Sequence, residues 1–370
     1  MISSAERGHA PATTRRRGTS GRRKALGLLA LMLSLTLLCI CSMVLGAKAT
    51  NLATINQAWP YALDILFGHT NVPQLITNGM ESDLADTAGI IASLRIPRTI
   101  LSILIGIALG LAGPVIQGLT RNPLADPGML GVSSGAALFV AAGIFLFGLN
   151  TITAHLWLAF LGAGLASLLV FGISSTSVGK GDTLGLVLAG AALSASFSAI
   201  TSGIVYIDPN ALDTLRFWQA GSVTGRGFDI IIPALVPILI GTILALLSGP
   251  TLNVLGLGAE TAQALGTNVV RANFMGLITI TLLAGAATAA AGPIGFIGLM
   301  VPHIARSITG PDYRWILPYS ALTGAVTLLA ADIIGRLVMR PGELQAGIVI
   351  ALLGAPVFIW LVRNRKMVSL

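Results

Sequence analysis

Long stretches without charged residues alternate along this chain with short segments that carry charge, Gly or Pro. The uncharged stretches cover residues 99–120, 128–179, 183–207, 230–259, 272–305, 315–331 and 344–362. A membrane-crossing helix needs about 20 apolar residues, so several of these stretches must hold two spans. Of the 370 residues, 54% are hydrophobic and only 10% are charged. The pattern predicts an all-α, polytopic membrane protein.

We expect about ten transmembrane helices. The predicted spans cover residues 25–47, 97–119, 129–147, 155–173, 183–206, 230–247, 274–291, a shorter eighth helix that ends at 306, and then 316–334 and 344–362. Between the seventh and eighth spans, Gly292 and Pro293 must interrupt the helix because Pro lacks a backbone donor. The segment 48–94 is predicted to be an external loop, as is 207–228, and the segment 248–273 is predicted to be cytoplasmic.

The distribution of basic residues sets the predicted orientation. Residues 1–24 form an arm rich in Arg, Ser, Thr and Gly, which we expect to be disordered and to lie at the anionic cytoplasmic surface of the bilayer. With this span map most of the 22 Lys and Arg residues fall on the inner side of the membrane. Both termini are therefore predicted to be cytoplasmic. The transmembrane domain is residues 25–370. The arm has no aromatic residues, so we do not expect nucleic-acid binding.

Three arginines break this positive-inside pattern. Arg95, Arg98 and Arg336 fall on the external side, which predicts an acidic partner there. Pro97 is expected in the first turn of the second span. Cations near a helix N-terminus are disfavoured by the helix dipole, and a carboxylate partner would offset this cost for Arg95 and Arg98. Arginines that snorkel to lipid headgroups are the alternative. Asp332 lies four residues before Arg336, which predicts an ion pair within one helix.

Several catalytic patterns are incomplete. The string GVSSG at 131–135 matches the spacing of a nucleophile elbow, but neither Ser133 nor Ser134 has a predicted basic partner, so a serine hydrolase is disfavoured. The surroundings of Lys180 lack the glycine and hydroxyl positions of a phosphate-binding loop. The four His and two Cys residues have no metal-ligand spacing, so no metal site is predicted.

The energy source for transport is expected outside this chain. A proton-coupled secondary transporter needs a relay of ionisable groups at mid-membrane, and only Asp332 comes near that depth. On the inner side, residues 261–265 are predicted to form a short helix that ends at Gly266, with Ala262 and Leu265 on one exposed face. Such a face suits the docking of a partner protein, although an ordinary interfacial helix has the same pattern.

Strings spread over most of the chain resemble the iron-siderophore, haem and cobalamin permeases of ATP-binding cassette (ABC) importers. They are RIPR (95–98), Gln117 with TRNPLADP (120–127), LGVSSG (130–135), GPIGFIGL (292–299), VPHIAR (301–306) and GAP (354–356). The resemblance implies a type II ABC importer permease fold in a bacterial inner membrane. It also implies a second permease subunit, identical or different, two cytoplasmic ATPases that bind ATP and Mg²⁺, and an extracytoplasmic substrate-binding protein. No cofactor or metal is expected on this chain.

The resemblance also implies roles for particular residues. Arg95, Arg98 and Arg336 match positions that face acidic residues of the binding protein, and we expect Arg95→Glu with Arg98→Glu to weaken docking without unfolding the chain. The ATPase-coupling segment matches Glu260, Thr261, Ala262, Gln263, Ala264, Leu265 and Gly266, and the cytoplasmic gate region matches Ser177, Lys180 and Asp182. The chain departs from the family at Ala259 and Gln263, where acidic and Arg residues are common, and at Gln345, where Pro is common.

The expected cargo is a ferric siderophore, with haem and cobalamin as alternatives. The fifth span and the break at 292–299 are expected to border the transport path. A proton-coupled secondary transporter is the competing class.

Overall fold

The computed structural model describes residues 21–46, 48, 51–176, 183–340 and 342–363, and these residues form helices without strands. The elements are α1 (Gly21–Val44), α2 (Leu52–Leu66), α3 (Val72–Thr77), α4 (Ser82–Ile90), η1 (Ile91–Arg95), α5 (Ile96–Thr120), η2 (Pro127–Leu130), α6 (Val132–Phe147), α7 (Ile152–Thr176), α8 (Thr183–Ile207), α9 (Pro209–Trp218), α10 (Phe228–Leu247), α11 (Gly249–Leu255), α12 (Ala259–Ala264), α13 (Val269–Ile280), η3 (Thr281–Gly285), α14 (Ala286–Ala291), α15 (Ile297–Thr309), α16 (Tyr313–Val338) and α17 (Ala346–Arg363). The predicted all-α class is confirmed.

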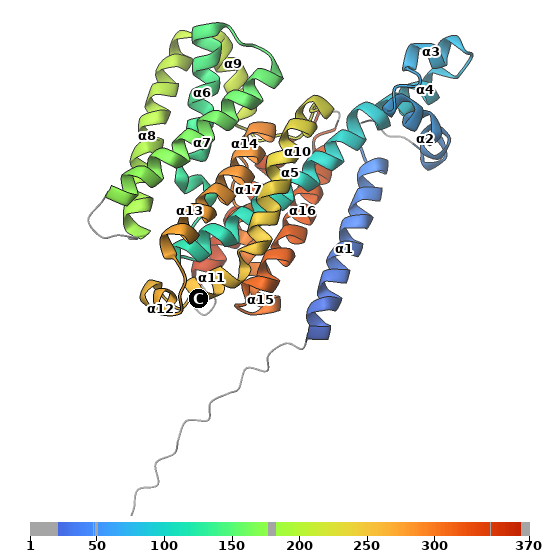
Figure 1. Cartoon of the computed structure of the whole chain (residues 1–370). Helices are drawn as coiled ribbons and strands as arrows, with labels where there is room; N and C mark the ends of the chain where they lie inside the picture. The colour runs from blue at the N-terminus through green and yellow to red at the C-terminus, as the bar shows by residue number, and fades with distance from the viewer. Residues whose placement is uncertain (1–20, 47, 49–50, 177–182, 341, 364–370) are drawn as a thin grey trace, which may run out of the picture.

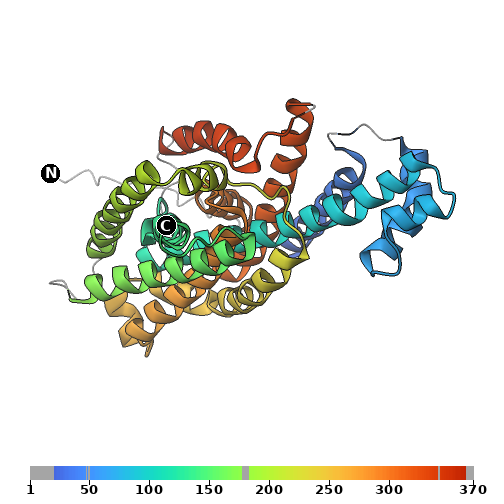
Figure 2. The same cartoon turned by 90° about the horizontal axis from the view of Figure 1, so that it is seen from above.

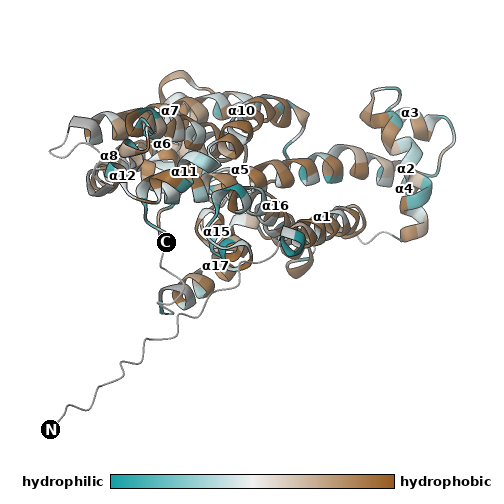
Figure 3. Cartoon of the chain, turned by 60° about the horizontal axis from the view of Figure 1, so that its bottom comes forward, coloured by the Kyte–Doolittle hydropathy of each residue, from teal (hydrophilic) through white to brown (hydrophobic). Residues whose placement is uncertain are grey.

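Within the described residues, seven helices are long and apolar enough to cross a membrane, and α6 and α17 are shorter apolar helices. Figure 3 shows apolar residues along most of the length of the long helices. At 13 residues, α15 is about 20 Å long and is too short to cross a hydrocarbon core of about 30 Å by itself. Together these ten helices occupy the positions of the ten predicted spans.

The break between α14 and α15 is confirmed. Gly292 has a φ of 78°, and Phe296 has a φ of 67°, which is rare for a residue with a side chain. The loop that follows α9 supports the break, because the Ser222 N–H donates to the Ala291 carbonyl over 2.7 Å. The chain therefore crosses this region as a helix, a non-helical stretch and a second short helix.

The region predicted as an external loop, 48–94, is largely helical. Asn51 and Asn71 cap α2 and α3 with their side chains. Helix α2, helix α4 and η1 share a small apolar core: Ile55, Ala58, Ala62, Ala88, Ile91 and Ala92. Helix α3 packs against α4. In Figures 1 and 2 this outer group of α2, α3 and α4 projects from the main bundle. The second predicted loop, 207–228, likewise contains α9.

The second span does not begin at Pro97. A continuous apolar helix runs from Ser82 to Thr120, and its turns widen to a π-helix between Ile91 and Arg95. There the Ile96 N–H donates to the Ile91 carbonyl, five residues back. A widened turn tolerates the missing N–H of a proline, so the helix continues through a residue that normally starts one. The prediction of a helix N-terminus beside Arg95 and Arg98 is therefore wrong.

Helices α5 and α16 pack against each other through small residues. A Cβ atom added to Gly110 would lie 2.3 Å from the Ser320 carbonyl oxygen, and one added to Gly324 would lie 2.1 Å from the Gly106 carbonyl oxygen. Glycines let two membrane helices approach this closely because there is no side chain between the backbones. The close approach brings the outer end of α16 beside α5.

Candidate functional site

A buried carboxylate joins α5 to α16 at the outer end of the bundle. Arg98 Nη2 lies 2.7 Å from Asp332 Oδ1, and its Nε donates to both carboxylate oxygens over 2.8 and 3.0 Å. Arg336 pairs with Oδ2 of the same carboxylate, and its Nε donates to that oxygen over 3.1 Å. The predicted ion pair between residues four apart is confirmed. Asp332 is completely buried. Arg98, which lies 234 positions earlier in the chain, reaches it from α5.

The network extends to a second carboxylate, which the sequence did not reveal. Arg98 Nη1 lies 2.6 Å from Glu343 Oε2, and the Thr224 hydroxyl donates to the same oxygen over 3.3 Å. The Glu343 side chain is 28% exposed, whereas that of Arg98 is 8% exposed. Glu343 therefore covers the guanidinium group from the solvent side.

The other arginines hold the end of α1. Arg336 donates to the Ser42 hydroxyl over 2.8 Å and to the Ser42 carbonyl over 3.1 Å. Arg95 donates to the carbonyls of Met43, Val44 and Lys48. The last carbonyls of a helix have no partner within the helix and carry partial negative charge, so cations stabilise them. Both guanidinium groups thus anchor α1 to the bundle.

These contacts change the interpretation of the three arginines as surface docking residues. Arg95, Arg98 and Arg336 are all buried within the chain. Replacing Arg98 by Glu would place a third carboxylate against Asp332 and Glu343, so the expectation that Arg95→Glu with Arg98→Glu leaves the chain folded does not fit this burial. Contact of these arginines with a binding protein stays a prediction, and contact through Arg98 requires the carboxylate of Glu343 to move aside.

At the opposite end of the bundle, the predicted coupling segment is a short exposed helix. Figure 1 shows α11 and α12 at the end of the bundle away from α9 and the outer group. Gly258 and Gly266 bracket α12 with φ angles of 105° and 83°. Gly266 ends the helix as predicted, because glycine adopts this left-handed conformation without strain.

The predicted exposed face of this helix is wrong in one respect. Ala262 is fully buried, whereas Leu265 is 62% exposed. In so short a helix, Ala262 is turned inward between the neighbouring helices, and Leu265 follows the last turn outward. Glu260, Thr261, Gln263 and Ala264 are also exposed. The accessible surface of this helix is thus formed by three polar residues and Ala264, with Leu265 beside them.

Hydrogen bonds fix this inner segment to α16. The Asn253 side-chain amide donates to Asp312 over 2.7 Å, and its oxygen accepts the Tyr313 N–H over 2.9 Å. Burial is the largest single influence and acts to raise the pKa of Asp312. The bonds from Asn253 and from the Arg314 N–H, together with the charges of Arg314 and Lys24, outweigh it and hold the pKa below its ordinary value. Because the carboxylate stays ionised, α11 remains tied to the start of α16.

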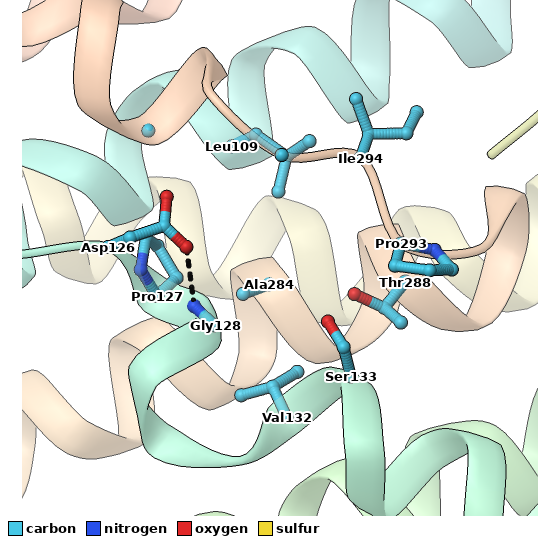
Figure 4. A pocket seen from close by; sticks show the side chains of 12 residues that line it. Leu109, Asp126, Pro127, Gly128, Val132, Ser133, Ala284, Thr288, Pro293 and Ile294 are labelled. Atoms are coloured by element: carbon cyan, nitrogen blue, oxygen red, sulfur yellow. Dashed lines mark hydrogen bonds between the residues drawn. The ribbon is translucent and has the colours of Figure 1, made fainter. Parts of the chain in front are cut away.

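A small cavity of about 110 Å³ lies between η2, α6 and the break before α15. Figure 4 shows the oxygens of Asp126, Ser133 and Thr288 in its lining. Burial raises the pKa of Asp126, and its bond from the Gly128 N–H opposes that rise. Among the residues that the structure describes, no His, Lys or Arg lines the cavity, so Ser133 has no basic side chain beside it there.

Two further predictions concern the gate region and the N-terminal arm. Ser177, Lys180 and Asp182, the predicted gate residues, lie outside the described residues, as do residues 1–20 of the predicted basic arm. The helix α1 begins at Gly21, within the range assigned to that arm. Among the described residues, no group of three or more His, Cys, Asp or Glu is placed to hold a metal ion.

A family model places this architecture among known proteins. The model of the FecCD transport family matches residues 34–364. The chain belongs to the FecCD transport family. This match covers the outer arginine network, the α14–α15 break and the inner segment together, and the resemblance drawn from the sequence strings is confirmed.

Curated permeases with assigned transport systems are similar over most of the chain. The ferric enterobactin transport system permease protein FepD of Escherichia coli is 46% identical over 306 residues, which are 82% of this chain and 91% of that protein. The hemin transport system permease protein HmuU of Yersinia pestis is 42% identical over 74% of this chain and 83% of that protein. The cobalamin import system permease protein BtuC of Halobacterium salinarum is 34% identical over 90% of this chain and 94% of that protein.

A solved structure has the same fold. A metal-chelate type ABC transporter in an inward-facing conformation aligns with a TM-score of 0.77 and 28% identity, covering 92% of this chain and 99% of that chain. This FecCD family member is therefore an all-helical transport permease with the fold of an ABC importer subunit, and it is a multi-pass membrane protein.

Proposed function

We propose that this chain is the membrane-spanning subunit of an ABC importer that carries a ferric siderophore across the bacterial cytoplasmic membrane. The observation that carries the proposal is the 46% identity with the ferric enterobactin permease, which extends over 91% of that protein. Haem and cobalamin are the other candidate cargoes, since similar permeases are named for them.

The proposed partners bind at opposite ends of the bundle. Two cytoplasmic ATPases, which bind ATP and Mg²⁺ and hydrolyse the ATP, dock at α12, where the exposed side chain of Leu265 offers an apolar contact. A substrate-binding protein docks at the outer end, near Glu343. A second permease subunit, identical or different, completes the path. Positive charge at both ends of the sequence supports cytoplasmic termini.

A proton-coupled mechanism has less support. Asp332, the carboxylate inside α16, already pairs with Arg98 and Arg336. A carboxylate that compensates two buried cations is poorly suited to release and bind protons during transport, because each protonation would leave those cations uncompensated. The energy source is instead assigned to the ATPases.

Uptake measurements in cells test the cargo. A strain that lacks this chain, and the same strain complemented with it, are given a radiolabelled ferric siderophore, haem or cobalamin. Loss of ferric siderophore uptake in the deletion strain, with recovery on complementation, is the expected result. Loss of haem or cobalamin uptake instead would reassign the cargo within the same class.

If the binding protein docks at Arg98, Glu343→Gln is expected to change its affinity for the transporter. The substitution removes the carboxylate that competes for Arg98, so the affinity of the binding protein for the detergent-solubilised transporter is expected to rise by roughly three- to tenfold. Surface plasmon resonance measures this change. The matched control is Glu81→Gln, because Glu81 is exposed at the start of α4 and makes no capping bond there. An unchanged or lower affinity for Glu343→Gln would remove Arg98 from the docking surface.

A further inference from the structure

A chain of polar side chains joins three helices at the end of the bundle where α12 lies. Arg306, in the last turn of α15, donates through Nη1 to the Gln117 side-chain oxygen over 2.7 Å and through Nη2 to the Tyr313 hydroxyl over 3.2 Å. Its guanidinium carbon also lies 5.7 Å from the centre of the Tyr313 ring, which adds a cation–π contact. Arg306 thus connects α5 to the start of α16.

Gln117 is completely buried in α5, and both ends of its amide are bonded. An arginine can only donate hydrogen bonds, so the amide oxygen faces Arg306. The amide Nε2 donates to the Gly298 carbonyl over 3.2 Å and to the Ala125 carbonyl over 3.5 Å. Gly298 is the second residue of α15, directly after the α14–α15 break. Gln117 therefore holds both the end of α15, through Arg306, and its beginning.

The start of α15 is packed against its neighbours by direct backbone contact. A Cβ atom added to Gly113 would lie 2.1 Å from the Gly298 carbonyl oxygen, and one added to Gly298 would lie 2.9 Å from the Pro127 ring. The His303 ring also bonds to the Pro123 carbonyl through Nε2 over 3.0 Å. Close-packed interiors leave no free space between such groups, so a shift of α15 displaces the break.

The other end of the chain reaches the predicted coupling segment. The Tyr313 N–H donates to the Asn253 side-chain oxygen over 2.9 Å, and Asn253 belongs to α11. Helix α11 packs against α12, and Ala262 of α12 is buried in the same apolar core as Leu252 of α11. A continuous series of contacts thus leads from α12 through α11 and Tyr313 to Arg306.

We propose that Gln117, Arg306 and Tyr313 form an inner brace, which transmits a movement of α12 to the α14–α15 break during transport. This inference rests on the proposed function, because the docked ATPase imposes that movement. Tyr313 and Arg306 connect the coupling segment to α15, and Gln117 fixes both ends of α15 to α5. The three are positioning residues, since none of them lines the cavity beside the break.

The number of ferric siderophore molecules taken up per ATP hydrolysed tests the brace in proteoliposomes that contain the complete transporter. Tyr313→Phe removes only the hydroxyl bond to Arg306 and keeps the ring, so uptake per ATP is expected to fall by about three- to fivefold. Gln117→Leu removes the bonds to Arg306 and Gly298 together, so a fall of about tenfold is expected. In both variants the rate of ATP hydrolysis is expected to stay within about twofold of the parent rate.

Thr309→Val is the matched control. Thr309 is on α15 and is 2% exposed, and its hydroxyl donates to the carbonyls of Ala305 and Gly310, at the same end of that helix. Its removal costs a buried hydroxyl without breaking the brace, so uptake per ATP is expected to match the parent. The double variant Tyr313→Phe with Gln117→Leu is expected to be no worse than Gln117→Leu alone, because both changes interrupt one chain of contacts.

A purely structural role predicts a different result. Uptake and ATP hydrolysis would then fall in proportion as folded transporter is lost, and this outcome would overturn the proposal. Parental uptake per ATP in Tyr313→Phe and Gln117→Leu would overturn it as well. If the parent itself shows no ATP-dependent uptake, the proposed function fails and the brace fails with it. ATP-dependent uptake by the parent, with an unchanged ratio in both variants, refutes the brace alone.

Discussion

Replacing Asp332 by Asn is expected to lower the free energy of unfolding by about 3–5 kcal/mol, because two buried guanidinium groups lose their shared carboxylate. Asp332 is fully buried and pairs with Arg98 and Arg336. An amide keeps the shape and one acceptor oxygen but carries no charge. Thermal unfolding of the purified protein in detergent measures the loss, and α1 should detach first, since Arg336 also holds Ser42.

Asp229→Asn provides the matched control for this prediction. Asp229 is an exposed carboxylate near the start of α10, so its removal is expected to change the stability by less than about 1 kcal/mol. Adding Arg336→Met to Asp332→Asn should cost less than the sum of the two single changes, because it removes one of the uncompensated cations. Equal stability of Asp332→Asn and the parent would contradict the structural role of the network.

Leu265→Asp is expected to abolish transport without unfolding the chain. Leu265 is 62% exposed next to α12, so an aspartate there keeps its hydration in the isolated subunit. In the proposed transporter the same position faces an ATPase, where a buried and unpaired carboxylate costs several kcal/mol. Siderophore uptake in proteoliposomes should fall to background, and the ATPase should no longer co-purify with the permease.

Leu52→Asp is the control for this effect. Leu52 is 64% exposed and lies at the start of α2, on the outer end, where an acidic residue suits a helix N-terminus. Uptake by this variant is expected to match the parent. Full transport by Leu265→Asp, with the ATPase still bound, would remove the coupling role of α12.

The features that are predicted correctly from the sequence depend on residues that lie close together along the chain. Uncharged stretches located the spans, because hydrophobic length is a local property. The pairing of Asp332 with Arg336 followed from helical spacing. Gly292 and Gly266 marked a break and a helix end, because their backbone conformations disfavour other residues. Each of these inferences uses residues within one continuous stretch of the chain.

The errors arose where distant segments decide the outcome. Pro97 is a normal helix start, yet the π-helical turn before it lets the helix continue back to Ser82. The burial of Arg98 depends on Glu343, which lies 245 positions later. Helical spacing places Ala262 and Leu265 on one face, but packing of the short helix buries Ala262 and leaves Leu265 exposed. The small cavity beside the α14–α15 break is likewise not predicted from the sequence, because its lining residues come from separate helices.

Reconstitution with an imposed energy source tests the central claim most directly. The chain is assembled in proteoliposomes with its partner permease, ATPase and binding-protein subunits, and uptake of a radiolabelled ferric siderophore is measured with ATP supplied on the ATPase side. The account predicts uptake that requires ATP hydrolysis and persists when an uncoupler dissipates the proton gradient. Uptake driven by a proton gradient in the absence of ATP would contradict it.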